Sequence, residues 1–256
     1  MDAYNRRFNL KHLLIVILIL IIILAVVISI SQFTFRKQYS PPTALSVLMP
    51  RYRVIDMDNI DVKSDKDKDG INDQKDIMTG AKTQLEKPAV NIFSEGLNES
   101  NYYSGGDPPP ELAICTDVIA RAFKQAGFDI RQLVFDDISI NFSEYPLRAL
   151  WGQNRPDPDI DYRRIQNLEV FFKRNASPQT LTFSYANEQE LIKWLPGDIV
   201  FFDMDRDGHT DNAGIISDFT TRKGIPKIIY NFIEPGYTVE SEILTSSKIT
   251  GHYRWP

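Results

Sequence analysis

The chain has 256 residues and one cysteine, Cys115, whose sequence surroundings are those of a candidate nucleophile. From Thr116 onward, apolar residues recur at spacings of three and four, which predicts a helix that ends near Gly127. Cys115 would then lie at the N-terminus of this helix, where unpaired amide groups and the helix dipole favour a thiolate. The alternative is an inert core cysteine, because cysteine is among the most frequently buried residue types.

A thiol nucleophile needs a general base, and the sequence offers three histidines. His12 adjoins the apolar N-terminal stretch and is excluded for that reason. His209 lies in an acidic turn and could act only if the turn reaches inward. His252 lies in a predicted terminal strand, where packing or hydrogen bonding is the more ordinary role. His209 and His252 therefore both stay candidate bases.

A second pattern with chemical meaning is a twelve-residue acidic segment that begins at Asp65. Carboxylates stand at positions 1, 3, 5, 9 and 12, and Gly70 stands at position 6, where a sharp turn requires glycine. Calcium takes roughly 6–8 oxygen ligands, one of them the backbone carbonyl at position 7. We expect a structural Ca²⁺ ion here, whose ligands are Asp65, Asp67, Asp69, Ile71, Asp73 and Asp76. A solvated acidic turn is the alternative, and no organic cofactor is expected.

The turn from Asp203 to Asp211 repeats this alternation of acidic residues. Its position 12 is Gly214, so one carboxylate is missing. Strands are predicted on both sides of the turn, which favours an ordinary hairpin connection. Cation binding is the alternative for this segment.

The N-terminal stretch is strongly apolar, and Leu13 to Ile30 contains no charged residue. Roughly 20 helical residues at about 1.5 Å each cross a hydrocarbon layer of ~30 Å. We therefore expect a transmembrane helix over residues 13–35, with the bilayer as partner, rather than a cleaved signal peptide. A weak bias of basic residues predicts a cytoplasmic tail, residues 1–12, and an extracytoplasmic position for the rest of the chain.

The remaining sequence divides into a stalk (residues 36–60), the acidic loop (residues 61–77) and one domain (residues 78–256). In the domain a helix comes first, and predicted strands follow at residues 197–203, 214–217, 227–230 and 248–253. This order is typical of an α+β fold in which helices pack on an antiparallel sheet.

Composition excludes some functions. The formal net charge is −5 and there is no basic stripe, which argues against a nucleic-acid partner. One cysteine rules out an intramolecular disulfide.

Several segments resemble known families. The cysteine helix, residues 194–200 and residues 214–218 resemble the NlpC/p60-type papain-like cysteine hydrolases. More specific matches, from about Ile77 to the C-terminus, resemble the bacterial family called domain of unknown function 1287. They lie at residues 114–118, 151–152, 155–157, 160–164, 167–168, 171–174 and 248–254. The resemblance implies a papain-like fold and hydrolysis of amide bonds, often in cell-wall peptides. A cysteine would attack, a strand histidine would act as base, and a third polar residue would orient that histidine.

Carried onto this sequence, the resemblance makes Cys115 the nucleophile and Asn231 the assisting polar residue. The base position, two residues before Gly214, is Asn212, whose amide cannot accept a proton near neutral pH. The leading expectation is a membrane-anchored extracytoplasmic cysteine hydrolase, with His209, His252 or no base at all. One alternative is a degenerate relative that binds a cell-surface peptide or glycan without cleaving it. Another is a calcium-braced scaffold.

Overall fold

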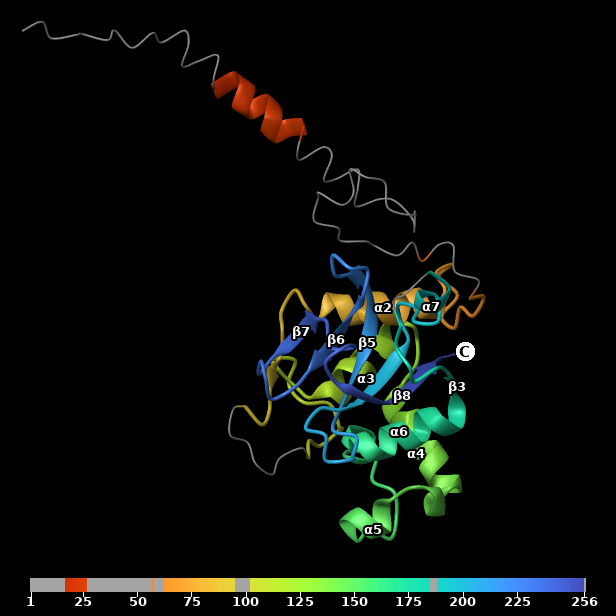
Figure 1. Ribbon diagram of the computed structural model, residues 1–256. Coiled ribbons are helices and arrows are strands. Elements are labelled where there is room, and N and C mark those ends of the chain that lie inside the picture. The colour runs from red at the N-terminus through yellow and green to blue at the C-terminus, as the bar shows by residue number, and fades with distance from the viewer. Residues whose placement is uncertain (1–16, 27–56, 58–61, 95–101, 185–187, 256) are drawn as a thin grey trace, which may run out of the picture.

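A computed structural model describes residues 17–26, 57, 62–94, 102–184 and 188–255 of the chain. In it a six-stranded sheet of order β3-β8-β4-β5-β6-β7, antiparallel throughout, packs against helices (Figure 1). The helices are α2 (Asp73–Thr83), α3 (Cys115–Gln125), α4 (Ile130–Ile140), α5 (Leu147–Trp151), α6 (Ile165–Asn175) and α7 (Glu188–Leu191). The sheet strands are β3 (Ser177–Pro178), β4 (Ile199–Asp203), β5 (Asn212–Thr220), β6 (Pro226–Asn231), β7 (Thr238–Ser241) and β8 (Lys248–Arg254). The predicted α+β class with an antiparallel sheet is confirmed.

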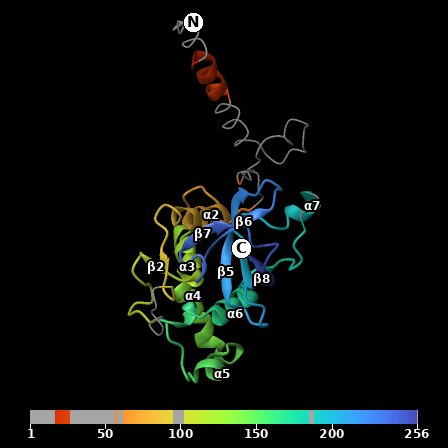
Figure 2. The same cartoon turned by 60° about the vertical axis from the view of Figure 1, so that its left-hand side comes forward.

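The sheet carries an apolar core on each face. Because side chains alternate along a strand, Ile199 and Phe201 of β4 belong to one core and Val200 and Phe202 to the other. Helices α2, α3, α4 and α6 contribute to the first core, and Figure 2 shows α2, α3 and α4 gathered on one side of the strands. The second core is built around Trp194. Each face of the sheet therefore has its own chemical surroundings.

The cysteine helix α3 forms because its apolar residues share one face. Val118, Ile119, Ala122 and Phe123 are fully buried in the first core. At the N-terminus the Asp117 carboxylate accepts the Ile114 backbone N–H at 2.9 Å, which satisfies one of the amide groups that begin the helix. Residue Gly127, with φ +74°, closes the C-terminus as expected.

Helix α2 begins directly after the acidic loop. The Asn72 side chain caps it by accepting the Lys75 N–H at 2.9 Å. The helix crosses α3 closely, because Gly80 has no Cβ and an added one would lie 2.7 Å from the Ala122 oxygen. The predicted boundary between the loop (61–77) and the domain (78–256) therefore falls inside one helix, and the described part of the loop is continuous with the domain.

A second, two-stranded element connects the start of the cysteine helix with the large sheet. Strand β1 (Val90–Asn91) pairs in parallel with β2 (Leu112–Ala113), which leads directly into α3. The Asn91 N–H also donates to the Gly236 carbonyl at 2.8 Å, beyond β6. The start of the cysteine helix is thus tied to the end of the large sheet.

The predicted membrane anchor requires a correction. Of residues 13–35, the structure describes only residues 17–26, which are helical. Among the described residues, no helix is long and apolar enough to span a membrane. The single-pass prediction is therefore contradicted. The predicted tail (1–12) and, apart from Met57, the predicted stalk (36–60) lie outside the described residues.

Candidate functional site

A cavity of about 420 Å³ lies at the N-terminus of α3. Residues from α3, α6, the segment after β1, the end of β6 and the second acidic turn line it. Its walls combine apolar, amide and charged side chains, which include Asn91, Phe93, Ile114, Cys115, Trp151, Arg164, Ile165, Asp205, Asp211, Asn231, Phe232 and Ile233. Cys115 therefore contacts a cavity and is not enclosed entirely by core packing.

The Cys115 side chain is nevertheless poorly exposed, at 5% of its surface. Burial raises the pKa of its thiol to about 12. The backbone amides of Ala213 and Thr116 lower the pKa of the thiol, while the carboxylates of Asp117 and Asp211 raise it. Since burial is the largest of these effects, the group is a neutral thiol near pH 7. A pKa of about 12 does not agree with the thiolate expected from the helix dipole.

Residue Asn212 begins strand β5 directly before Ala213, whose amide faces the sulfur. The Asn212 side chain is fully buried, and its Oδ1 accepts the Ala213 N–H at 2.9 Å. Its Nδ2 has no hydrogen-bond partner among the described residues. A buried amide with an unused donor thus stands where the resemblance places the base.

The structure does not bring His252 to this cavity. In the sheet His252 is opposite Val200, on the face of the second core, and its ring stacks on Trp194 at 4.0 Å between centroids. Its Nδ1 lies 2.9 Å from the Thr180 carbonyl oxygen and its Nε2 lies 3.1 Å from Asp198 Oδ2. The sheet therefore separates His252 from α3, which packs on the opposite face.

The other candidate base, His209, is exposed in the second acidic turn. Its backbone N–H donates to Asp207 Oδ1 at 2.8 Å, and the residue is not among those lining the cavity. In this conformation neither candidate histidine faces the Cys115 cavity.

Asn231 does line the cavity, but its amide is occupied in holding the fold. Its Nδ2 donates to the Ala89 carbonyl at 2.9 Å and to Thr238 Oγ1 at 3.0 Å. Its Oδ1 accepts from Asn91 Nδ2 at 2.8 Å. These bonds fasten β6 to residues 89–91, which is the contact that closes one side of the cavity.

Sequence reasoning assigned no role to two cavity features. The guanidinium of Arg164 lies 4.2 Å from the centre of the Trp151 ring and bonds to Asp161 at 3.1 Å, so it forms a flat, charged part of the wall. Asn91 contributes an amide to the wall of the same cavity. Trp151 and Arg164 lie in sequence segments that resemble the known family, so the resemblance could have identified them. Asn91 lies in none of these segments.

Comparison with known proteins identifies the domain. Residues 79–255 match the family described as "Domain of unknown function (DUF1287)". The chain belongs to the DUF1287 family. It is also similar to "Uncharacterized protein YijF" of Escherichia coli (strain K12), with 34% identity over 179 residues, which cover 70% of this chain and 80% of the relative. No solved structure matches.

The first acidic loop precedes the residues that match the DUF1287 family. It forms a sharp turn in which backbone N–H groups donate to the carboxylates of the same loop. Lys68 and Gly70 have positive φ values of 63° and 91°, which produces the sharp turn. The Gly70 N–H donates to Asp65 Oδ2 at 3.0 Å, and the Ile71 N–H donates to Asp69 Oδ1 at 2.8 Å. One carboxylate oxygen from each of Asp65, Asp67 and Asp69 lies within 4.8 Å of the other two.

Asp76 completes the acidic pattern from the first turn of α2. The residue is only 3% exposed, and its Oδ2 has no hydrogen-bond partner among the described residues. Burial, together with the nearby carboxylates of Asp69, Asp67, Asp73 and Asp65, raises the pKa of its carboxyl to about 6. The Asp76 carboxylate therefore belongs to the electrostatic surroundings of the loop.

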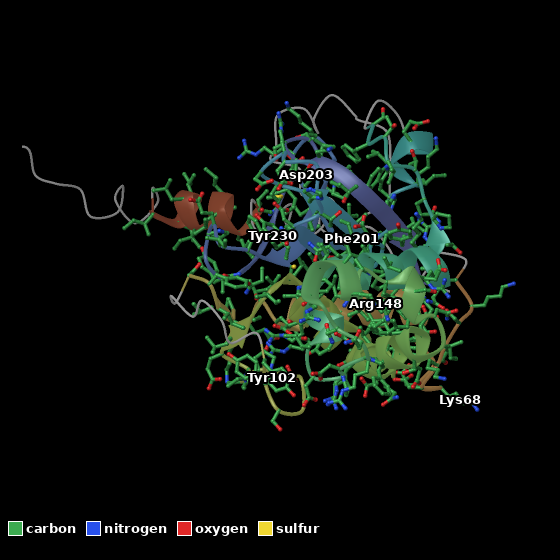
Figure 3. The ribbon with its side chains drawn as sticks, turned by 90° about the horizontal axis from the view of Figure 1, so that it is seen from below. Lys68, Tyr102, Arg148, Phe201, Asp203 and Tyr230 are labelled. Carbon is green, nitrogen blue, oxygen red and sulfur yellow. The ribbon has the colours of Figure 1, made fainter. Side chains whose placement is uncertain are left out.

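The second acidic turn, within the DUF1287 domain, has the same backbone form. Arg206 and Gly208 have φ values of 65° and 99°, and the Gly208 N–H donates to Asp203 Oδ2 at 3.1 Å. It differs in that the Lys248 ammonium lies 2.8 Å from the same oxygen of Asp203. Figure 3 labels Lys68 in the first loop and Asp203 in the second, and the two lie on separate parts of the domain.

Proposed function

We propose that the cavity beside Cys115 binds a peptide or glycan ligand, which the domain holds without cleaving. The observation that supports this most strongly is Asn212 at the position of the base, because its amide cannot take a proton from the thiol. The raised pKa of Cys115 agrees with it, since a neutral thiol is a weak nucleophile.

The composition of the cavity suits such a ligand. Its volume of about 420 Å³ lies in the ~300–1,000 Å³ range of small-molecule sites, which are mostly apolar with a few polar groups. Apolar walls from Ile165 and Ile233 would exclude water from bound groups, and the carboxylates of Asp205 and Asp211 would attract an ammonium group. A peptide fragment carries amide, apolar and ammonium groups together, and a cell-wall peptide linked to sugar is one such ligand.

A second candidate function is hydrolysis by a papain-like mechanism of the NlpC/p60 type. The observation in its favour is that Cys115 begins α3 and lines the cavity, where the backbone amides of Ala213 and Thr116 lower the pKa of its thiol. Amide groups at a helix start are suited to holding an oxyanion. Among the described residues, however, neither candidate histidine faces the thiol to accept its proton, and we rank hydrolysis second.

The experiment uses the purified full chain and a muropeptide, which carries both a glycan and a peptide part. Titration calorimetry measures binding, and mass spectrometry measures cleavage of the same samples. We expect wild type to bind without cleavage and Cys115→Ala to bind equally well. We expect Asn212→His to gain cleavage, which the double variant Asn212→His with Cys115→Ala lacks.

A matched pair of substitutions at exposed isoleucines tests whether the ligand binds in this cavity. Ile233 is 52% exposed and lines the cavity, whereas Ile140 is 83% exposed at the end of α4 and is not among its lining residues. Ile233→Glu should weaken binding at least tenfold, which corresponds to about 1.4 kcal/mol, and Ile140→Glu should leave it unchanged. Cleavage by wild type that is lost in Cys115→Ala would favour the hydrolase, and the absence of muropeptide binding would overturn the proposal.

A further inference from the structure

We propose that the loop from Asp65 to Asp76 binds one Ca²⁺ ion, which fastens the start of α2 to the turn that follows the cysteine helix. The ligands would be the carboxylates of Asp65, Asp67, Asp69, Asp73 and Asp76 and the carbonyl of Ile71. This site is separate from the Cys115 cavity, and it does not depend on what that cavity binds.

The decisive observation is the buried carboxylate of Asp76. The residue is 3% exposed, and its Oδ2 is buried with no hydrogen-bond partner among the described residues, so this oxygen has lost its hydration without a protein donor in return. An isolated buried carboxylate is costly unless it is paired or coordinates a metal. The charged groups that act on Asp76 are the other carboxylates of the loop, so its surroundings are negative and include no compensating positive charge among these groups. A cation among these groups would remove the conflict.

The loop backbone leaves the right oxygens available. One oxygen of Asp65 accepts the Gly70 N–H, while the other, Oδ1, is buried and has no hydrogen-bond partner among the described residues. In the same way Asp69 Oδ1 accepts the Ile71 N–H and Asp73 Oδ1 accepts the Lys66 N–H, each at 2.8 Å. Backbone donors thus orient these carboxylates through one oxygen and leave the second oxygen for an ion.

The second acidic turn shows why the proposal is limited to the first loop. Its turn geometry is the same, so geometry alone does not distinguish the two. There, however, the Lys248 ammonium already pairs with Asp203, and position 12 is Gly214, which has no side chain. The first loop has five carboxylates, and none of them forms an ion pair with another described residue.

An ion in the first loop would act on the domain through two contacts. The loop packs on the turn after α3, where an added Cβ at Gly127 would lie 3.1 Å from the Asp67 Cβ, and the Lys66 ammonium lies 5.9 Å from the Phe128 ring centre. On α2, Gln74 Nε2 donates to Asp198 Oδ1 at 2.8 Å. Binding would therefore stabilise the folded domain, since the unfolded chain has no preformed site.

The test titrates the full chain, freed of metal with a chelator, with calcium chloride. Calorimetry measures binding, and thermal unfolding measures Tm with and without the ion. We expect one ion per chain and a higher Tm in calcium. The matched variants are Asp67→Asn and Asp205→Asn, at position 3 of the first and second loop. Asp67→Asn should lower calcium affinity at least tenfold and remove the Tm increase, whereas Asp205→Asn should preserve both.

A third variant separates coordination from a merely structural role for Asp76. Asp76→Asn removes the uncompensated buried charge, so it should raise the Tm of the metal-free chain while weakening calcium binding. If Asp76 only packed, the same variant would leave calcium affinity unchanged, and that result would contradict the proposal. So would the absence of binding heat and Tm change in wild type, or loss of calcium binding in Asp205→Asn but not in Asp67→Asn.

Discussion

The Arg163 guanidinium donates to both carboxylate oxygens of Asp117, at 2.8 and 2.9 Å, and neither side chain is exposed to solvent. Asp117 stands two residues after Cys115 in the first turn of α3, and it also accepts the Ile114 N–H. The pair connects η4 (Asp161–Arg163) to the start of the cysteine helix. It therefore fixes the backbone that presents the sulfur to the cavity.

Removing one partner of this pair should be strongly destabilising. Arg163→Ala leaves the Asp117 carboxylate buried without its counter-ion, which costs about 3–5 kcal/mol of unfolding free energy. Chemical denaturation followed by circular dichroism measures this loss. The control is Lys193→Ala, which removes the half-exposed pair with Glu190 and should cost less than about 1 kcal/mol. Equal losses in the two variants would show that the buried pair has no special part in stability.

Alkylation of Cys115 should depend on pH as expected for a buried thiol. Because burial raises the pKa of the folded thiol to about 12 from an ordinary value of 9.0, iodoacetamide should label the native chain slowly at neutral pH. The pKa of the thiol is higher in the folded chain than in the unfolded chain. Its contribution to the free energy of unfolding is therefore fully present below pH 9.0 and is lost as the pH rises toward about 12, because the unfolded thiol then ionises first. Labelling in denaturant, where the thiol titrates normally, is the control. Rapid native labelling at pH 7 would show an activated thiolate and favour the hydrolase.

Alanine substitutions of the two candidate histidines should change the free energy of unfolding by different amounts, and neither should change the reactivity of Cys115. His252→Ala removes a fully packed ring with two polar contacts and should cost about 3 kcal/mol or more. His209→Ala changes an exposed turn residue and should stay within about 0.5 kcal/mol. Neither should alter the rate of Cys115 alkylation once folding is verified. A slower rate in His209→Ala alone would mean that the His209 side chain itself reaches the cavity.

Gly197 should not tolerate a side chain. It has φ +89°, and an added Cβ would collide with the Gln74 backbone of α2. Gly197→Ala therefore combines backbone strain of about 1–2 kcal/mol with displacement of α2. Gly152→Ala is the matched control, because Gly152 also has a positive φ (63°) but has no atom within 4 Å of the added Cβ. Thermal unfolding should show a clearly lower Tm for Gly197→Ala than for Gly152→Ala.

Much of the scaffold could be predicted from local patterns. The spacing of apolar residues and the glycine at 127 located α3, and short apolar runs located β4, β5, β6 and β8 to within a few residues. Helix α4 was missed, although Ile130, Val134 and Ile138 recur every four residues on its buried face. Its Asp129 cap was also visible in the sequence.

The sequence by itself determined the elements, the family resemblance and the absence of histidine at the base position, because these depend on residues that are close along the chain or on motif order. The tertiary structure decided which groups meet. Burial, which depends on the whole packing around α3, outweighs the helix dipole at Cys115. Strand register turns His252 toward the second core. Both effects arise from contacts between distant segments, and the local spacing of residues carries no information about them.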